Sequence, residues 1–252
     1  MNIQEYLNRI QYRGSTEPNL QTLSALQAAH MQTVPFENLS VHYKQPIILK
    51  EELLYQKIVR QNRGGFCYEL NGLFAWLLRE LGYRVTRLSA GVAGKDKGFG
   101  PDFDHMTLMV HLDEDYLVDV GFGDSFQTPL RFNVREAQSQ GGMSYQISAE
   151  GEAFVLSEQN NGDESPSMQA QYRFTLHPHE LTEYEGMCHY HQTSPESSFT
   201  RKRVCSMATP GGRITLSDLR FIITEEGAMT ERELGSEEEF SRTLKEYFNI
   251  RL

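Results

Sequence analysis

One stretch in the first third of the chain constrains its fold most. The run Gly64-Gly65-Phe66-Cys67 interrupts the pattern before it, and an apolar stripe with helical spacing follows: Leu70, Leu73, Phe74, Leu77, Leu78 and Leu81. Such spacing is typical of a helix that buries one face. Gly82 comes directly after the stripe, where many helices place a left-handed residue. The sequence therefore predicts a helix over residues 66–81.

Cys67 lies in the first turn of this predicted helix. Backbone N–H groups without a helical partner and the positive end of the helix dipole favour a thiolate at that position. The alternative is a buried cysteine that packs as a small apolar side chain. Cys67 is a candidate nucleophile, and the rest of the chain has to supply a base.

The patterns before and after this helix differ. Helices are expected over residues 2–10, from 20 until Pro35 interrupts the pattern, and over 50–61. From residue 83 onward, short apolar segments separated by turn residues predict an antiparallel sheet or barrel. These segments are 85–92, 105–112, 116–120, 131–134, 145–147, 153–156 and 172–176.

The last part of the chain is expected to mix strands with a helix. After a crossing segment around 180–198 come the strands 204–208, 214–216 and 220–224, and a final helix whose capping box is Ser236 and Glu239. Two polar stretches, 94–104 and 158–166, are expected to be flexible loops. The changes of pattern divide the chain into residues 1–82, 83–190 and 191–252.

Composition excludes several classes of protein. The 252 residues are 39% apolar and 23% charged, and no run approaches the ~20 apolar residues of a membrane span. The net charge of −10 makes nucleic acid or an anionic membrane an unfavourable partner. The first residues lack a secretion signal, and the three cysteines, Cys67, Cys188 and Cys205, are widely spaced. We expect a cytoplasmic protein without a disulfide framework.

A thiol nucleophile needs a base and a group that orients the base. His105 begins one predicted strand and Asp119 ends the next, and their even separation places them on the same face of a hairpin. Pairing centred on Leu112 would set them opposite each other. The polar turn 113–115 instead suggests a centre nearer Glu114, which offsets them by about four residues, roughly 13 Å. Closing that gap would need a bulge, a strong twist or a longer turn.

Each of these residues has another interpretation. A histidine at a strand start is often solvated, an aspartate before glycine is often a turn residue, and Asp102 and Asp104 are competing partners for His105. A group of possible metal ligands occurs later in the chain: His177, His179, Cys188, His189 and His191. Its spacing matches no compact zinc motif, so no metal site is expected.

Two further segments suggest phosphate binding only weakly. The basic run 201–203 could contact phosphates, but a solvated surface run is the commoner explanation. The glycine-containing segment 98–101 is too short, and wrongly placed, for a Rossmann or Walker loop.

Several sequence blocks together resemble the arylamine N-acetyltransferases. They are Val34-Pro35-Phe36-Glu37-Asn38-Leu39, Arg63-Gly64-Gly65-Phe66-Cys67-Tyr68-Glu69 with Asn71-Gly72-Leu73, His105-Met106-Thr107-Leu108, Asp119-Val120-Gly121-Phe122-Gly123 and Thr193-Ser194-Pro195-Glu196-Ser197-Ser198-Phe199. The blocks follow the order of the family and span nearly the whole chain. Agreement over several blocks is more specific than any single motif.

The resemblance implies an α+β fold: an N-terminal helical bundle, a central antiparallel β-barrel and a C-terminal α/β lid, with a Cys-His-Asp core of transglutaminase or papain type. It implies that Cys67, His105 and Asp119 form the catalytic triad. It further implies that Phe36 and Phe122 lie beside the acceptor pocket. Glu37 and Arg63 match a structural ion pair near the nucleophile.

The implied activity is transfer of an acetyl group from acetyl-CoA, a co-substrate rather than a bound cofactor, to arylamines or arylhydrazines. The scheme is ping-pong through an acetyl-cysteine, with His105 as the base. Two alternatives remain open at this point. One is a cysteine protease or transglutaminase-like amide transferase with the same triad, and the other is a small-molecule binding module in which Cys67 is inert. The oligomeric state cannot be inferred from the sequence.

Overall fold

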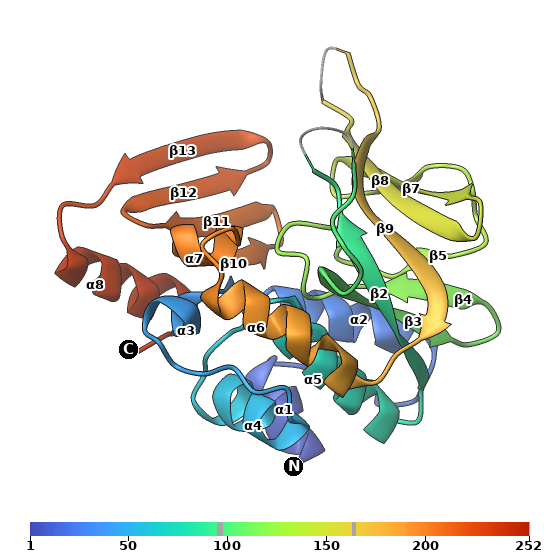
Figure 1. The fold of residues 1–252 in the computed structure, drawn as a ribbon, viewed down its shortest axis with the longest axis horizontal. Coiled ribbons are helices and arrows are strands. Elements are labelled where there is room, and N and C mark those ends of the chain that lie inside the picture. Colours follow the sequence, from blue (N-terminus) through green and yellow to red (C-terminus); the bar gives the residue numbers. More distant parts are fainter. Residues whose placement is uncertain (95–97, 163–164, 252) are drawn as a thin grey trace.

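The computed structural model describes residues 1–94, 98–162 and 165–251. Figure 1 shows an eight-stranded sheet on one side of the molecule and a five-stranded sheet with its helix on the other. The N-terminal helices lie below and between the two sheets (Figure 1). Among the described residues, no helix is long and apolar enough to cross a membrane.

The N-terminal part is helical, as predicted. Its elements are α1 (Ile3–Arg9), α2 (Leu20–Met31), α3 (Leu39–His42), α4 (Glu51–Tyr55), the π-helix η1 (Gln56–Arg60) and α5 (Cys67–Glu80). Leu81 is the C-cap of helix α5, and Gly82 follows with a φ of +91°. The left-handed glycine after the stripe therefore ends the helix as expected.

Helix α5 is more deeply buried than its apolar stripe predicts. Every residue from Cys67 to Leu78 is buried, including the polar Glu69 and Asn71. The reason is that α5 packs against β2 and β3 of the large sheet and also against α1 and α4. A helix covered on all sides has to satisfy its polar side chains internally, and two of them take part in the candidate site.

The large sheet is antiparallel, in the order β5-β4-β3-β2-β9-β8-β7-β6. Its strands are β2 (Arg84–Val92), β3 (His105–His111), β4 (Asp115–Val118), β5 (Leu130–Arg131), β6 (Gln138–Gln140), β7 (Met143–Glu150), β8 (Ala153–Asn160) and β9 (Gln169–Pro178). The Gln138 amide joins the two edge strands by exchanging bonds of 2.9 and 3.0 Å with the backbone of Arg131. This link makes the sheet a nearly closed barrel, in agreement with the predicted α+β fold.

Strand β8 extends farther than expected, to Asn160, because it pairs with β7 along its whole length. The second predicted loop, 158–166, therefore begins later than the sequence suggests. Residues 95–97 of the first predicted loop and 163–164 of the second lie outside the described residues.

The segment after the barrel is helical: η2 (Leu181–Tyr184), α6 (Glu185–Thr193) and α7 (Ser198–Arg201). A second antiparallel sheet follows, in the order β1-β10-β11-β12-β13. Its strands are β1 (Phe36–Glu37), β10 (Val204–Thr209), β11 (Gly212–Ser217), β12 (Arg220–Glu225) and β13 (Ala228–Glu233). Helix α8 (Glu237–Phe248) begins after Ser236, whose hydroxyl accepts a bond from the Glu239 N–H, as its sequence predicts.

The N-terminal and C-terminal parts of the chain are joined by strand β1. Phe36 pairs with Ser206 and Glu37 with Cys205, so two residues of the first third form an edge of the C-terminal sheet. Glu37 also accepts a backbone bond at Leu39, which begins α3. The division at residues 82 and 190 stays a prediction, and this strand pair crosses it.

Candidate active site

Cys67 is the first residue of α5, and the chain before it is held against β1. The Gly65 N–H donates to the Pro35 carbonyl at 3.3 Å, and the Glu37 N–H donates to the Gly65 carbonyl at 2.9 Å. A side chain at Gly64 would collide with the Pro35 carbonyl. The paired glycines therefore allow a close approach of two backbones, in addition to interrupting the preceding helix.

The start of α5 is capped by Glu69. Its carboxylate accepts the Phe66 N–H at 3.2 Å, and the Glu69 N–H donates to the Phe66 carbonyl at 3.0 Å. This arrangement satisfies backbone groups that the first helical turn leaves without a partner. It fixes the position of Cys67 between Phe66 and the rest of the turn.

The register of the hairpin that carries His105 and Asp119 differs from both expected registers. Leu108 pairs with Val118 and His111 with Asp115, so the pairing is centred on Asp113. Continued by one residue, this ladder would set Asp119 opposite Thr107, two residues from His105 on the same face. Diagonal neighbours of this kind are within reach of long side chains. His105 Nε2 lies 2.6 Å from Asp119 Oδ2, and no bulge separates the paired strands β3 and β4.

Asp119 is completely buried and has further hydrogen-bond donors. Asn71 Nδ2 donates to its Oδ1 at 2.9 Å, and the Gly121 N–H donates to the same oxygen at 2.9 Å. Burial alone would raise the pKa of Asp119, but the charge of His105 and the bonds from His105, Asn71 and Gly121 hold it below its ordinary value. The carboxylate is therefore ionised and fixed beside the imidazole.

Asn71 links this carboxylate to helix α5. Its amide also donates to the Met106 carbonyl at 2.6 Å and accepts the Val120 N–H at 3.0 Å. Because Asn71 lies four residues after Cys67, both side chains lie on one face of α5. A single helix face thus presents the thiol and the amide that holds Asp119.

The loop after Asp119 lies directly on the start of α5. A Cβ atom at Gly121 would lie 2.8 Å from the Cys67 Cα and 2.9 Å from the Cys67 carbonyl oxygen. The backbones of the two segments therefore touch at this point. The hydrogen-bonded His105–Asp119 pair is thus connected through Gly121 to the start of α5, and Cys67, His105 and Asp119 are all buried, with exposed fractions of 3%, 2% and 0%.

The imidazole of His105 is enclosed by aromatic rings. The ring centroids of Phe122 and Tyr172 lie 5.1 and 5.0 Å from that of His105. The Tyr172 hydroxyl is 3.2 Å from the Thr107 hydroxyl. Since Nε2 is engaged by Asp119, Nδ1 is the nitrogen left to exchange a proton with another group.

The electrostatic surroundings of Cys67 differ from the expected ones. Burial raises the pKa of the Cys67 thiol well above its usual value, and Asp119 adds to this effect, while a hydrogen bond with the Met106 backbone opposes it. Burial therefore favours the protonated thiol. A thiolate at neutral pH requires the proton to pass to a base within the cluster.

Glu37 and Arg63 form an ion pair beside the start of α5, with 2.8 Å between Arg63 Nη2 and Glu37 Oε1. Lys57 extends this pair, because its Nζ lies 2.7 Å from Glu69 Oε1 and 3.9 Å from Glu37 Oε1. Burial would raise the pKa of Glu37, but Lys57 and Arg63 lower it below its ordinary value. Two cations and two carboxylates thus stabilise the segment before Cys67 and the first turn of α5.

The residues of the alternative interpretations, other partners for His105 and a metal site, have different contacts in the structure. The Asp104 carboxylate lies 3.2 Å from His191 Nε2 and accepts the Val92 N–H at 3.2 Å, whereas Asp102 is exposed. Cys188 is bound by Gln192 through its sulfur at 3.3 Å. Within the described part of the chain, no three His, Cys, Asp or Glu side chains come together as a metal site.

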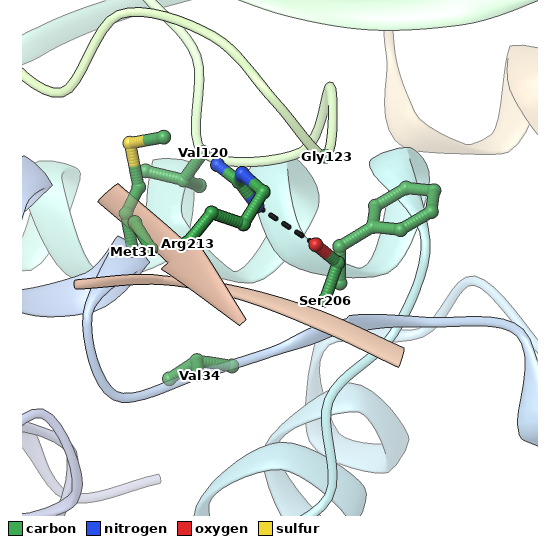
Figure 2. Close-up of a pocket in the computed structure, with 8 residues that line it drawn as sticks. Met31, Val34, Val120, Gly123, Ser206 and Arg213 are labelled. Atoms are coloured by element: carbon green, nitrogen blue, oxygen red, sulfur yellow. Dashed lines mark hydrogen bonds between the residues drawn. The ribbon is translucent and has the colours of Figure 1, made fainter. Parts of the chain in front are cut away.

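A small pocket lies between the loop after Asp119 and the five-stranded sheet. Figure 2 shows Val120 and Gly123 on one side of it, and Ser206 and Arg213, joined by a 3.0 Å hydrogen bond, on the other. Phe36 also lines this pocket, whereas Phe122 lies against His105. Its volume of about 10 Å³ admits little more than one water molecule.

A larger groove, of about 760 Å³, lies between the segments around β2 and the helices α6 and α7. Its lining includes Asp104, His191 and Arg201. Because Asp104 precedes His105 in the chain, the groove borders the candidate site. Its volume is within the range of small-molecule sites.

Comparison with known proteins identifies the family of this chain. A model of the N-acetyltransferase family matches residues 19–252. The chain is 36% identical to the Gallus gallus arylamine N-acetyltransferase, pineal gland isozyme NAT-3, over 100% of its own length and 95% of that protein. The chain belongs to the arylamine N-acetyltransferase family. The predicted resemblance is thus confirmed, and the family consists of acyltransferases.

Other members of the arylamine N-acetyltransferase family show the same similarity. Human arylamine N-acetyltransferase 1 is 34% identical, with 100% of this chain and 95% of that protein covered. The solved structure of the Mycobacterium tuberculosis enzyme superposes with a TM-score of 0.91, at 32% identity and with 99% and 94% of the two chains covered. The structure of the Mycobacterium marinum enzyme in complex with CoA gives a TM-score of 0.90, at 31% identity over 99% and 93% of the chains.

Sequence reasoning missed two residues of this cluster, Asn71 and Gly121. Asn71 was visible as a polar residue within the apolar stripe, four positions after the candidate nucleophile. Gly121 belongs to one of the family blocks, but its local pattern indicates only a turn. The contact that requires a glycine there joins segments far apart in the sequence, so no local pattern indicates it.

Proposed function

We propose that this protein transfers an acetyl group from acetyl-CoA to arylamines or arylhydrazines through an acetyl-Cys67 intermediate. The observation that carries the proposal is the hydrogen-bonded His105–Asp119 pair, packed by way of Gly121 onto the helix start that bears Cys67. Relatives named arylamine N-acetyltransferases align with the whole chain, and one similar solved structure holds CoA.

In the first half-reaction, His105 takes the proton of the Cys67 thiol and Asp119 stabilises the imidazolium. The thiolate attacks the thioester carbonyl of acetyl-CoA, and a new carbon–sulfur bond forms. The bond to the sulfur of CoA then breaks, and CoA leaves as a thiol with the proton from His105. One thioester replaces another, so the step is nearly balanced in energy. Backbone N–H groups in the first turn of α5 would stabilise the tetrahedral oxyanion.

In the second half-reaction, the amine nitrogen attacks the acetyl carbonyl on Cys67. His105 accepts a proton from the amine, the carbon–sulfur bond breaks, and the Cys67 sulfur leaves as a thiolate. The products are the acetylated amine and the restored thiolate–imidazolium pair, as in a ping-pong scheme.

The two cavities suggest where the two substrates bind. The groove of about 760 Å³ suits the acyl donor, and Arg201 offers a positive charge for its phosphates. Phe36 and Phe122 would contact the acceptor ring, since an uncharged aromatic amine enters an apolar site without desolvation of a charge. The pocket beside Phe36 has to widen for this purpose, because it holds only about 10 Å³.

The burial of the cluster also bears on the rival activities. A protease or transglutaminase has to admit an extended peptide, whereas Cys67, His105 and Asp119 are almost entirely enclosed. Enclosure favours small substrates and protects an acetyl-cysteine from water. A binding module with an inert cysteine would not require the buried His105–Asp119 pair, whose desolvation costs free energy.

Mass spectrometry of the intact protein and its peptides after incubation with acetyl-CoA alone tests the proposal. We expect one acetyl group on the Cys67 peptide and its removal on addition of an arylamine. Cys188→Ser and Cys205→Ser are matched controls that should acetylate normally. His105→Ala should stop acetylation while the fold is retained, as checked by circular dichroism. An unmodified Cys67 peptide in the wild-type protein would refute the ping-pong scheme.

A further inference from the structure

A strained backbone corner precedes the candidate base. Phe103 has a φ of +64°, and the Asp104 N–H donates to the Pro101 carbonyl at 3.3 Å, which closes a turn over residues 101–104. A positive φ at the third residue of such a turn normally calls for glycine or asparagine. A bulky aromatic residue in this conformation is a rare outlier, and such outliers persist only where their surroundings impose them.

The surroundings that impose this conformation come from two other elements. The Tyr68 hydroxyl donates between the carbonyl oxygens of Phe103, at 2.6 Å, and Asp104, at 3.1 Å. The Ser89 hydroxyl of β2 accepts the Phe103 N–H at 2.7 Å. The peptide groups on both sides of the corner are therefore held by side chains.

The corner determines how His105 enters its strand. His105 pairs with Ala90 at the last position of the β2–β3 ladder, so the ladder restrains it from one side only. On the other side, the Asp104 carbonyl that Tyr68 holds belongs to the same peptide group as the His105 N–H. A strand end that lacked this restraint would fray, and the imidazole would lose its fixed position.

Tyr68 connects this corner directly to the nucleophile, because it follows Cys67 in the first turn of α5. The position of the thiol and the position of the imidazole are thus linked through one phenol side chain. The Tyr68 ring is also fixed, since it packs against Phe66 at 5.2 Å and Tyr184 at 5.6 Å between centroids. The link is therefore a rigid one.

We propose that Tyr68 is a positioning residue for acyl transfer, whose hydroxyl holds the strained Phe103–Asp104 corner and thereby sets His105 against Cys67. The inference rests on the proposed function and deepens it, because it assigns a role to a residue that touches no reacting atom. It requires that loss of the hydroxyl slows the chemical step and leaves donor binding unchanged. A residue needed only for stability would not produce that pattern.

The test compares Tyr68→Phe with Tyr184→Phe. Tyr184 is the matched control, because its ring packs against Tyr68 and Phe103 and its buried hydroxyl has no hydrogen-bond partner among the described residues. Single-turnover acetylation of Cys67 by acetyl-CoA should slow by about tenfold to a hundredfold in Tyr68→Phe. The KM for acetyl-CoA should stay within about twofold, and Tyr184→Phe should acetylate at the wild-type rate.

A rescue experiment separates positioning from general destabilisation. Glycine adopts a positive φ without strain, so Tyr68→Phe combined with Phe103→Gly should recover part of the lost rate. The pH dependence of Cys67 alkylation by iodoacetamide should also shift in Tyr68→Phe, because it reports the thiol–imidazole pair. If Tyr68→Phe does not fold, Ser89→Ala, which removes the other restraint on the corner, decides the question with the same readouts.

Several outcomes would overturn the inference. They are a wild-type acetylation rate in Tyr68→Phe, an equal loss in Tyr184→Phe, or a loss that appears only in KM. Failure of the proposed function is distinguishable, because the wild-type protein would then gain no acetyl group at all. In that case the alkylation profile alone tests the corner, and an unchanged profile in Tyr68→Phe would refute it.

Discussion

Replacement of Asn71 by leucine should destabilise the fold and loosen Asp119 at the same time. The substitution keeps the size of the side chain and removes its hydrogen bonds to Met106, Asp119 and Val120, which have lengths of 2.6, 2.9 and 3.0 Å. All of these groups are buried, so water cannot replace the lost partners. The buried Val120 N–H, left without Asn71, would cost about 1–3 kcal/mol, and the weakened carboxylate a similar amount.

The expected sum for Asn71→Leu is about 2–6 kcal/mol. Asp119 keeps its bonds to Gly121 and His105, which limits the cost at the carboxylate. Against a typical total stability of about 5–15 kcal/mol, the variant should still fold but unfold at a lower urea concentration. Asn8→Leu, an exposed helical asparagine, is the matched control and should change the free energy of unfolding by about 0.5 kcal/mol or less.

The same substitution should alter the acid limit of stability. Asn71 is one of the donors that keep the pKa of Asp119 below its ordinary value, so its loss raises that pKa. Stability that depends on ionised Asp119 is present above the unfolded-state pKa and is lost as the pH falls through the folded-state pKa. Asn71→Leu should therefore lose this contribution at a higher pH than the wild-type protein. Urea unfolding across the acid range measures both effects, and a cost no larger than that of Asn8→Leu would refute the reasoning.

Three other substitutions test separate parts of the structure. Gly121→Ala should slow Cys67 acetylation at least about tenfold, since its methyl group would collide with the start of α5, whereas Gly186→Ala, which meets no atom within 4 Å, should acetylate normally. Lys57→Met should cost about 3–5 kcal/mol in urea unfolding, and much of this should be recovered when Glu69→Gln is added, because the buried carboxylate is then neutral. Burial and Asp124 raise the pKa of Glu158 from 4.5 to about 7, so its contribution to stability is lost as the pH rises through that range. Glu158→Gln should therefore reduce the fall in the free energy of unfolding between pH 4.5 and about pH 7. A pH profile of stability equal to that of the wild-type protein would contradict the raised pKa of Glu158.

Elements with strong local signals could be predicted from the sequence. Helix α5 has an apolar stripe and a C-terminal glycine, and α8 has a serine cap, so their bounds follow from short-range patterns. Strand β1 has two residues and exists only because the distant strand β10 pairs with it, and β6 has three residues, which pair with the neighbouring strand β7. Strand β13 is exposed throughout, so it lacks the alternation by which a strand is recognised.

The candidate site was predictable in its composition but not in its geometry. An even spacing placed His105 and Asp119 on one face, because side chains alternate along a strand. The register depended on which residue centres the turn, and the sequence allowed Leu112 or Glu114, whereas the structure centres it on Asp113. The resulting diagonal offset of two residues brings the two side chains to 2.6 Å without a bulge. All residues of this turn are polar, so the sequence does not indicate which of them is the centre of the strand pairing.

The state of the Cys67 thiol changes the role assigned to helix α5. The position of Cys67 at the helix N-terminus suggested that the helix itself lowers the pKa of the thiol. In the structure burial raises that pKa well above its usual value, so the proposed mechanism needs His105 to accept the proton before a nucleophile exists. Proton transfer of this kind depends on the distance between the Cys67 sulfur and the His105 imidazole. Helix α5 fixes the sulfur, and the hairpin fixes the imidazole. The groups that fix this separation, Asn71 and Tyr68, both lie on the first turns of α5 and both bind backbone groups of the hairpin segment. In the proposed mechanism, the contribution of α5 to reactivity is therefore the position that it gives the thiol relative to the imidazole.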